Sequence, residues 1–135
     1  MSYLRALPLF AFMLVLVNLF AFAAPAAFEG VWFAVPLVSG ATWKMTGGHV
    51  LLAISVVLLY VELLKATRSG SISILDHVLS TLVFVIFLLE FLLVAPMGNA
   101  VVFLIMLMTA ADVVGGFTVT ISTARRDFGG SPFEE

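Results

Sequence analysis

Residues 100–121 read AVVFLIMLMTAADVVGGFTVTI, a hydrophobic stretch with one acidic residue, Asp112, near its middle. A helix needs about 20 mostly apolar residues to cross a membrane, and this stretch has that length. A carboxylate at such a depth costs roughly 2.5–3.5 kcal/mol to insert, and it usually pairs, faces a bundle interior or serves transport. The stretch therefore predicts a transmembrane helix in which Asp112 is the main functional clue.

The rest of the chain repeats this pattern. Of its 135 residues only 10% are charged and 63% are hydrophobic, and the mean hydropathy is +1.23, which excludes a soluble domain. Because short links make consecutive helices antiparallel, we predict an all-α membrane protein, a four-transmembrane-helix up-down bundle. It forms one membrane domain over residues 1–128, with a short tail at 129–135. The four spans are expected at about residues 7–24, 47–66, 74–95 and 99–121.

The basic residues predict the orientation of the chain. Cytoplasmic loops are enriched in Lys and Arg, and with four spans only Lys44 falls on the opposite side from the other five basic residues. Both termini are therefore expected in the cytoplasm. In class and size the chain resembles small four-span bacterial inner-membrane proteins, and this resemblance implies a bacterial inner membrane. The five topology anchors are Arg5, Lys65, Arg68, Arg125 and Arg126.

A competing interpretation concerns the first span. Arg5, the apolar run after it and the small-residue segment Ala21-Phe22-Ala23 are also typical of a cleaved secretory signal peptide. Cleavage would leave three spans, with the new N-terminus outside. We expect the first helix to be retained.

Missing residue types and motifs narrow the function. Cysteine is absent, which excludes disulfides, thiolate catalysis and sulfur-ligated metals, and a net charge of −2 offers no basic surface for nucleic acid. No P-loop, GxSxG or HExxH motif occurs. His49 and His77 lie roughly 20 Å apart in depth, so they cannot ligate one haem iron together. We expect no enzymatic activity, no cofactor and no metal.

The segment between the first two spans is unusually apolar. Residues 28–36 read FEGVWFAVP, and Trp43 and Lys44 follow. Because Trp prefers the headgroup level, we predict an interfacial aromatic loop, formed as a short helix or a shallow re-entrant turn. Trp32 and Trp43 then act as lipid anchors or as contacts for a partner.

Polar residues recur on one side of each of the last three spans. Steps of three, four and seven residues return to the same helical face. If the polar faces turn inward together, they build a discontinuous ladder of titratable and hydroxyl groups. The three stripes are Gly48, Ser55 and Glu62; Asp76, Ser80, Val83, Phe87 and Glu90; and Thr109, Asp112, Gly116, Thr120 and Thr123.

This ladder has a functional and a structural interpretation. In the functional one, the protein is a proton- or cation-coupled transporter or channel. Its ion or proton path then consists of Asp112 and Glu90 with His49, Glu62, His77 and Asp76, where His49–Glu90 and Glu62–His77 form the outer and inner gates. In the structural one, Glu62 extends to the membrane surface or pairs with Lys65, Asp76 serves its helix N-terminus, and Glu90 and Asp112 are protonated or bonded across helices.

The fourth span also contains short side chains at helical spacing. Ala111-xxx-Gly115 and Gly116-xxx-Thr120 are small-xxx-small patterns, which allow close approach of helix backbones. They either pack inside the bundle or contact a second copy or a larger membrane complex. Our leading prediction is a non-catalytic polytopic protein of the lipid bilayer that acts through helix–helix association. It would serve as an accessory or assembly subunit or as a homo-oligomer.

Overall fold

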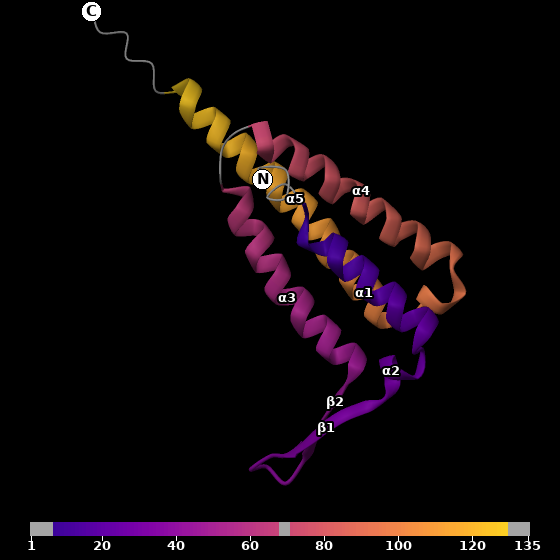
Figure 1. Ribbon diagram of the computed structural model, residues 1–135. Helices are drawn as coiled ribbons and strands as arrows, with labels where there is room; N and C mark the ends of the chain where they lie inside the picture. Colours follow the sequence, from indigo (N-terminus) through magenta and orange to yellow (C-terminus); the bar gives the residue numbers. More distant parts are fainter. Residues whose placement is uncertain (1–6, 68–70, 130–135) are drawn as a thin grey trace, which may run out of the picture.

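The computed structural model describes residues 7–67 and 71–129, and these are mostly helical (Figure 1). The predictions for Arg5, Arg68 and residues 130–135 therefore fall outside the described residues. Along the chain the elements are α1 (Leu9–Ala23), α2 (Ala26–Glu29), β1 (Val31–Pro36), β2 (Thr42–Thr46), α3 (Gly47–Ala66), α4 (Ser71–Leu93), the 3-10 helix η2 (Ala95–Met97) and α5 (Ala100–Gly129).

Among the described residues, three helices are long and apolar enough to cross a membrane. They comprise Gly47–Ala66, Ile74–Leu93 and Ala100–Arg126, with mean hydropathies of 2.0, 2.1 and 2.2. Helix α1 is equally apolar in character but has only 15 residues, about 22 Å at 1.5 Å per residue. These helices are those expected of an integral membrane protein.

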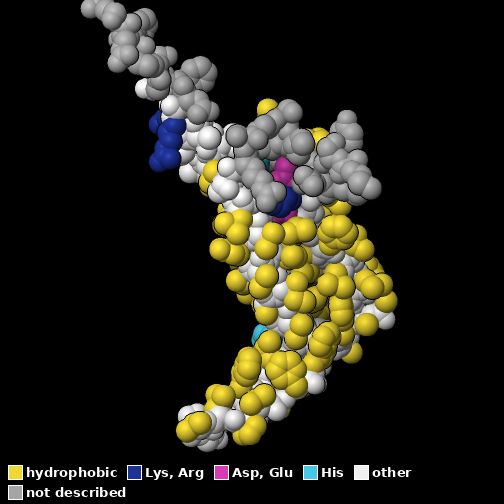
Figure 2. Space-filling model, turned by 60° about the vertical axis from the view of Figure 1, so that its left-hand side comes forward, with side chains coloured by type: hydrophobic (Ala, Val, Ile, Leu, Met, Phe, Trp, Pro, Cys, Tyr) yellow, Lys and Arg dark blue, Asp and Glu magenta, His cyan; other side chains and the backbone are white. Residues whose placement is uncertain are grey.

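The helices enclose an apolar core. Helix α5 packs against both α3 and α4, and α1 packs against the same two helices. Large hydrophobic side chains also cover the outside of the helices, as Figure 2 shows, which suits contact with lipid rather than water. The most deeply buried apolar residues are Phe10, Met13, Val17, Leu51, Phe87, Met97, Val102 and Ile105.

The two ends of the molecule differ in structure. The hairpin, α2 and η2 lie at one end, whereas the passage from α3 to α4 lies at the other (Figure 1). Helix α5 has 30 residues against 20 in α3 and 23 in α4, so its C-terminal part extends beyond that second end. Arg125 and Arg126 are exposed on this extension.

The segment between α1 and α3 differs from the predicted aromatic loop. After the short helix α2 it forms an antiparallel β-hairpin, in which Phe33 pairs with Met45 and Val35 with Trp43. Its runs VWFAV and TWKMT are rich in β-branched and aromatic residues, which favour strands. Gly40 supplies the positive φ, 85°, that the tight turn requires. The prediction weighed the apolar character of the segment but not the alternation within residues 41–46.

Candidate functional site

A buried charge cluster joins helices at the end opposite the hairpin. The Lys65 ammonium, near the end of α3, contacts Glu62 Oε2 at 2.9 Å and Asp76 Oδ1 of α4 at 3.2 Å. It also donates to the Leu7 carbonyl at 3.2 Å. Glu62 and Asp76 are only 2% and 7% exposed. One lysine therefore holds the carboxylates of two consecutive helices together.

Glu62 also connects α3 with the start of α1. Its Oε1 accepts a hydrogen bond from the backbone N–H of Leu9, the first residue of α1. The first amides of a helix have no partner within the helix, and the helix dipole favours a negative charge there. The Pro8 position before α1 provides no side-chain cap, so Glu62 supplies the missing acceptor.

Asp112 belongs to the same cluster. It is 5% exposed on α5, and the Ser80 side chain of α4 lies near its carboxyl. Glu62, Asp76 and Lys65 all lie close enough to act on it electrostatically. The stripes predicted Glu62, Asp76 and Asp112 at different depths of a ladder; in the structure Lys65 contacts Glu62 and Asp76, and Asp112 is buried within electrostatic range of them.

His77 provides another link between α4 and α5. Its Nε2 lies 2.8 Å from the Thr120 hydroxyl, which itself donates to the Gly116 carbonyl at 3.0 Å. Since that hydroxyl has only one proton, His77 Nε2–H is the donor to it. The ring also packs on Phe117, with centroids 5.5 Å apart. His77 is thus held by two residues of α5.

The paired glycines of α5 serve packing within the chain. A Cβ at Gly116 would lie 2.6 Å from His77 Cε1, and one at Gly115 would lie 2.5 Å from the Leu63 side chain of α3. Ala111 is exposed instead. Gly116-xxx-Thr120 therefore faces inward against α4, whereas the Ala111 end of the other pattern faces outward.

A second polar contact lies closer to the hairpin end. Asn18 of α1 donates to Glu90 Oε2 of α4 at 2.9 Å and to its own helix at the Leu14 carbonyl. Ser80 and Glu90 are separated along α4 by roughly 15 Å, and the buried residues Val83 and Phe87 fill that interval. The polar ladder is therefore interrupted by an apolar layer.

The buried hydroxyls of Ser55 and Thr109 do not connect the polar groups on the two sides of this apolar layer. Ser55 donates to the Leu51 carbonyl at 2.8 Å, and Thr109 donates to the Met106 carbonyl at 2.7 Å. Each of these bonds stays within a single helix. Both hydroxyls were predicted on the inward stripes, and both are buried there.

His49 caps the start of α3 at an exposed position. Its backbone N–H donates to Thr46 Oγ1 at 3.3 Å, and its ring Nδ1 accepts from the Thr46 backbone N–H at 3.2 Å. This reciprocal pattern is a capping box. Since Glu90 is bonded to Asn18, the outer gate formed by His49 and Glu90 is not assembled in this structure.

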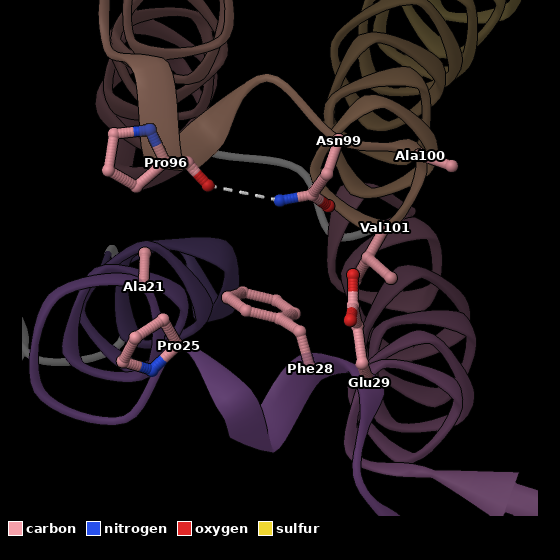
Figure 3. Close-up of a pocket in the computed structure, with 8 residues that line it drawn as sticks. All are labelled: Ala21, Pro25, Phe28, Glu29, Pro96, Asn99, Ala100 and Val101. Carbon is pink, nitrogen blue, oxygen red and sulfur yellow. Dashed lines mark hydrogen bonds between the residues drawn. The ribbon is translucent and has the colours of Figure 1, made fainter.

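A pocket of about 370 Å³ opens at the hairpin end, between the end of α1, α2 and the start of α5 (Figure 3). Glu29 is the charged side chain of its wall, and Asn99 donates to the Pro96 carbonyl at 3.2 Å across it. The sequence did not predict this pocket, because two segments far apart in the chain, residues 21–29 and 96–101, form it. Its lining consists of Ala21, Pro25, Phe28, Glu29, Pro96, Asn99, Ala100 and Val101.

Neither a metal site nor a similarity to a known protein assigns a function to the described residues. Within residues 7–67 and 71–129, no group of three or more His, Asp and Glu side chains is arranged to hold a metal ion. The chain matches no protein-family model, no curated protein and no solved structure. The function is therefore argued from the side-chain contacts alone.

Proposed function

We propose that the protein is a non-catalytic, polytopic protein of the bacterial inner membrane that acts through helix–helix association. It serves as an accessory or assembly subunit of a membrane complex, or as a homo-oligomer. In this proposal all four apolar helices, α1 included, cross the bilayer as an up-down bundle with both termini in the cytoplasm. The exposed Arg125 and Arg126 at the C-terminal end of the last span support this orientation.

The observation that carries the proposal is the use of each buried acid as a link between helices. Glu62 joins α3 to α1, Lys65 joins α3 to Asp76 of α4, and Asp112 of α5 is buried near Ser80 of α4. Polar side chains commonly stabilise helix contacts within membranes in this way. Bonds of this kind make a rigid unit that can present a fixed surface to a partner.

The outward face of α5 supports association. Its short residues Ala111, Thr118 and Ser122 are exposed, and both hydroxyls donate to carbonyls of α5 itself. They can therefore enter an apolar contact without an unpaired donor. Leu107, Val114 and Ile121 alternate with them on the same face, so the surface offers both the recesses and the projections that helix packing uses.

Cysteine crosslinking tests this surface directly, since the natural chain has no cysteine. Thr118→Cys on the outward face of α5 is compared in native membranes with Val57→Cys, an exposed position on α3. A short bismaleimide should crosslink the Thr118 variant to a second copy or to a partner of defined mass, and leave the Val57 variant monomeric. Native mass spectrometry in nanodiscs provides the second measurement. Equal crosslinking of both positions, together with only monomers in nanodiscs, would contradict the proposal.

A second candidate function is proton- or cation-coupled transport. It is favoured by one observation: Glu62 and Asp76 contact the Lys65 ammonium inside an apolar bundle, and the buried Asp112 lies within electrostatic range of all three. Flux in proteoliposomes distinguishes the two functions. Transport predicts that Asp112→Asn and Glu90→Gln each abolish flux, whereas association predicts that neither changes the crosslinking at Thr118.

A further inference from the structure

The β-hairpin sorts its paired residues into two unlike faces. Directly opposed residues of antiparallel strands share a face. One face, called here the apolar face, consists of Phe33, Val35, Trp43 and Met45. The rings of Phe33 and Trp43 meet edge to face on it, with centroids 6.1 Å apart. The other face, called here the Lys44 face, consists of Ala34, Pro36, Thr42 and Lys44.

The apolar face is open although it consists of large hydrophobic side chains. Phe33, Val35 and Trp43 are 41–48% exposed, and Val38 at the tip is fully exposed. Figure 2 shows the apolar surface of the helices continuing onto the hairpin without an intervening Lys, Arg, Asp or Glu on the side in view. A contiguous apolar surface of this kind marks an interaction with lipid or with protein.

We propose that the lipid headgroup interface covers this face. The hairpin lies in the interface with its apolar face toward the acyl chains, and Lys44 on the opposite face reaches the lipid phosphates. This inference rests on the membrane embedding of the helices and not on the association proposed for α5. Figure 1 supports it, since the hairpin turns away from the direction of α3 and does not continue the helix outward.

The backbone of the hairpin determines how deeply it can enter. The sheet has only two strands, so each strand leaves one edge without a hydrogen-bonding partner strand. Hydrocarbon cannot satisfy these groups, whereas the headgroup region supplies water and lipid oxygens. Trp side chains also prefer that level. The hairpin is therefore expected to lie at the headgroup level and not in the bilayer centre.

Tryptophan fluorescence tests this proposal because both tryptophans of the chain, Trp32 and Trp43, lie in the hairpin. The Trp32→Phe variant reports on Trp43 alone. Reconstituted into phosphatidylcholine and phosphatidylglycerol vesicles, it should emit at shorter wavelength than an exposed Trp and resist quenching by aqueous iodide. Lipids brominated near the headgroup should quench it more strongly than lipids brominated near the chain ends.

Two neighbouring substitutions provide the matched control. Val35→Glu places a charge on the apolar face, and Ala34→Glu places the same charge on the Lys44 face. Both are made in the Trp32→Phe background. Quenching by brominated lipid should be lost in the Val35 variant and retained in the Ala34 variant.

Two outcomes would overturn the proposal. Emission at long wavelength with strong iodide quenching would show that Trp43 is in water. Emission at short wavelength without quenching by any brominated lipid would assign the apolar face to a protein contact. The crosslinking of α5 is measured independently of the fluorescence. A failure of the association proposal can therefore be distinguished from a failure of the interfacial position of the hairpin.

Discussion

The charge cluster and the hairpin occupy opposite ends of the molecule. The first consists of charged side chains that are buried, and the second presents apolar side chains that are exposed. At one end Lys65 and three acids lie in an apolar bundle, and their partners come from the same chain, both within α3 and on neighbouring helices. At the other end the apolar face of the hairpin is about half exposed, with Phe33, Val35 and Trp43 at 41–48%. The first end is completed by intramolecular contacts, and the second requires an external surface.

This contrast indicates where stability and where interaction reside. Breaking contacts of the charge cluster should destabilise the helices, because a buried charge without its partner is costly. Changing the hairpin should alter the contact with the surroundings and leave the helices intact. The substitutions below test this division, from the largest expected effect to the smallest.

Lys65→Ala should have the largest effect. It leaves the buried carboxylates of Glu62 and Asp76 without the ammonium that joins them. Removing one partner of a buried ion pair costs about 3–5 kcal/mol. Unfolding by SDS in mixed micelles, followed by circular dichroism, measures this loss. Lys44→Ala on the hairpin removes the same type of side chain and serves as the control, which should unfold like the wild type. Equal stability of the two variants would show that the cluster does not hold the helices together.

The two glycines of α5 should differ in their response to an added methyl group. At Gly116 the new Cβ meets the His77 ring, which Thr120 and Phe117 hold in place. At Gly115 it meets the flexible end of Leu63. Overpacking costs typically 1–3 kcal/mol, whereas replacing Gly by Ala within a helix gains roughly 0.5–1 kcal/mol.

We therefore expect Gly116→Ala to be destabilised by about 1–2 kcal/mol and Gly115→Ala to lie close to the wild type. The same SDS titration measures both. A Gly116 variant as stable as the Gly115 variant would mean that His77 can shift, and that its contacts with α5 are weak.

The sequence predicted the faces of the helices but not the contacts between them. The inward stripes follow from helical periodicity, and Ser55, Glu62, Ser80, Thr109 and Asp112 are all buried as expected. Periodicity is a property of one helix at a time. Whether Asp112 approaches Glu62 depends on how far α5 is shifted along its neighbours, and α5 proved longer than its predicted span.

The hairpin was missed for a different reason. Residues 31–38 are continuously apolar and show no period of two, which only residues 41–46, ATWKMT, display. The pairing of Val35 with Trp43 separates an apolar face from Lys44, and such a face becomes evident only once the register is known. Asn18 and Glu90 are 72 residues apart in the sequence. Their contact could not be predicted either, because the periodicity of a single helix does not say which helix it faces.

The contact of Asn18 with Glu90 should contribute less than the charge cluster. Double-mutant cycles of side-chain hydrogen bonds between membrane helices average about 0.6 kcal/mol and reach about 1.7 kcal/mol. A cycle of Asn18→Ala, Glu90→Ala and the double variant, measured by SDS unfolding, should give a coupling energy in this range. Zero coupling would mean that α1 is held by Glu62 and apolar packing alone, and the polar layer near the hairpin end would then have no role in stability.

Val38→Asp should have the smallest effect on the helices. Val38 lies at the tip of the hairpin, fully exposed, and substitutions at such positions usually change stability by less than about 0.5 kcal/mol. SDS unfolding of this variant should match that of the wild type. A loss as large as that of Asn18→Ala would mean that the hairpin folds back onto the helices within the membrane. The charge cluster and the hairpin would then belong to one cooperative unit, and the division between a self-contained end and an interacting end would not hold.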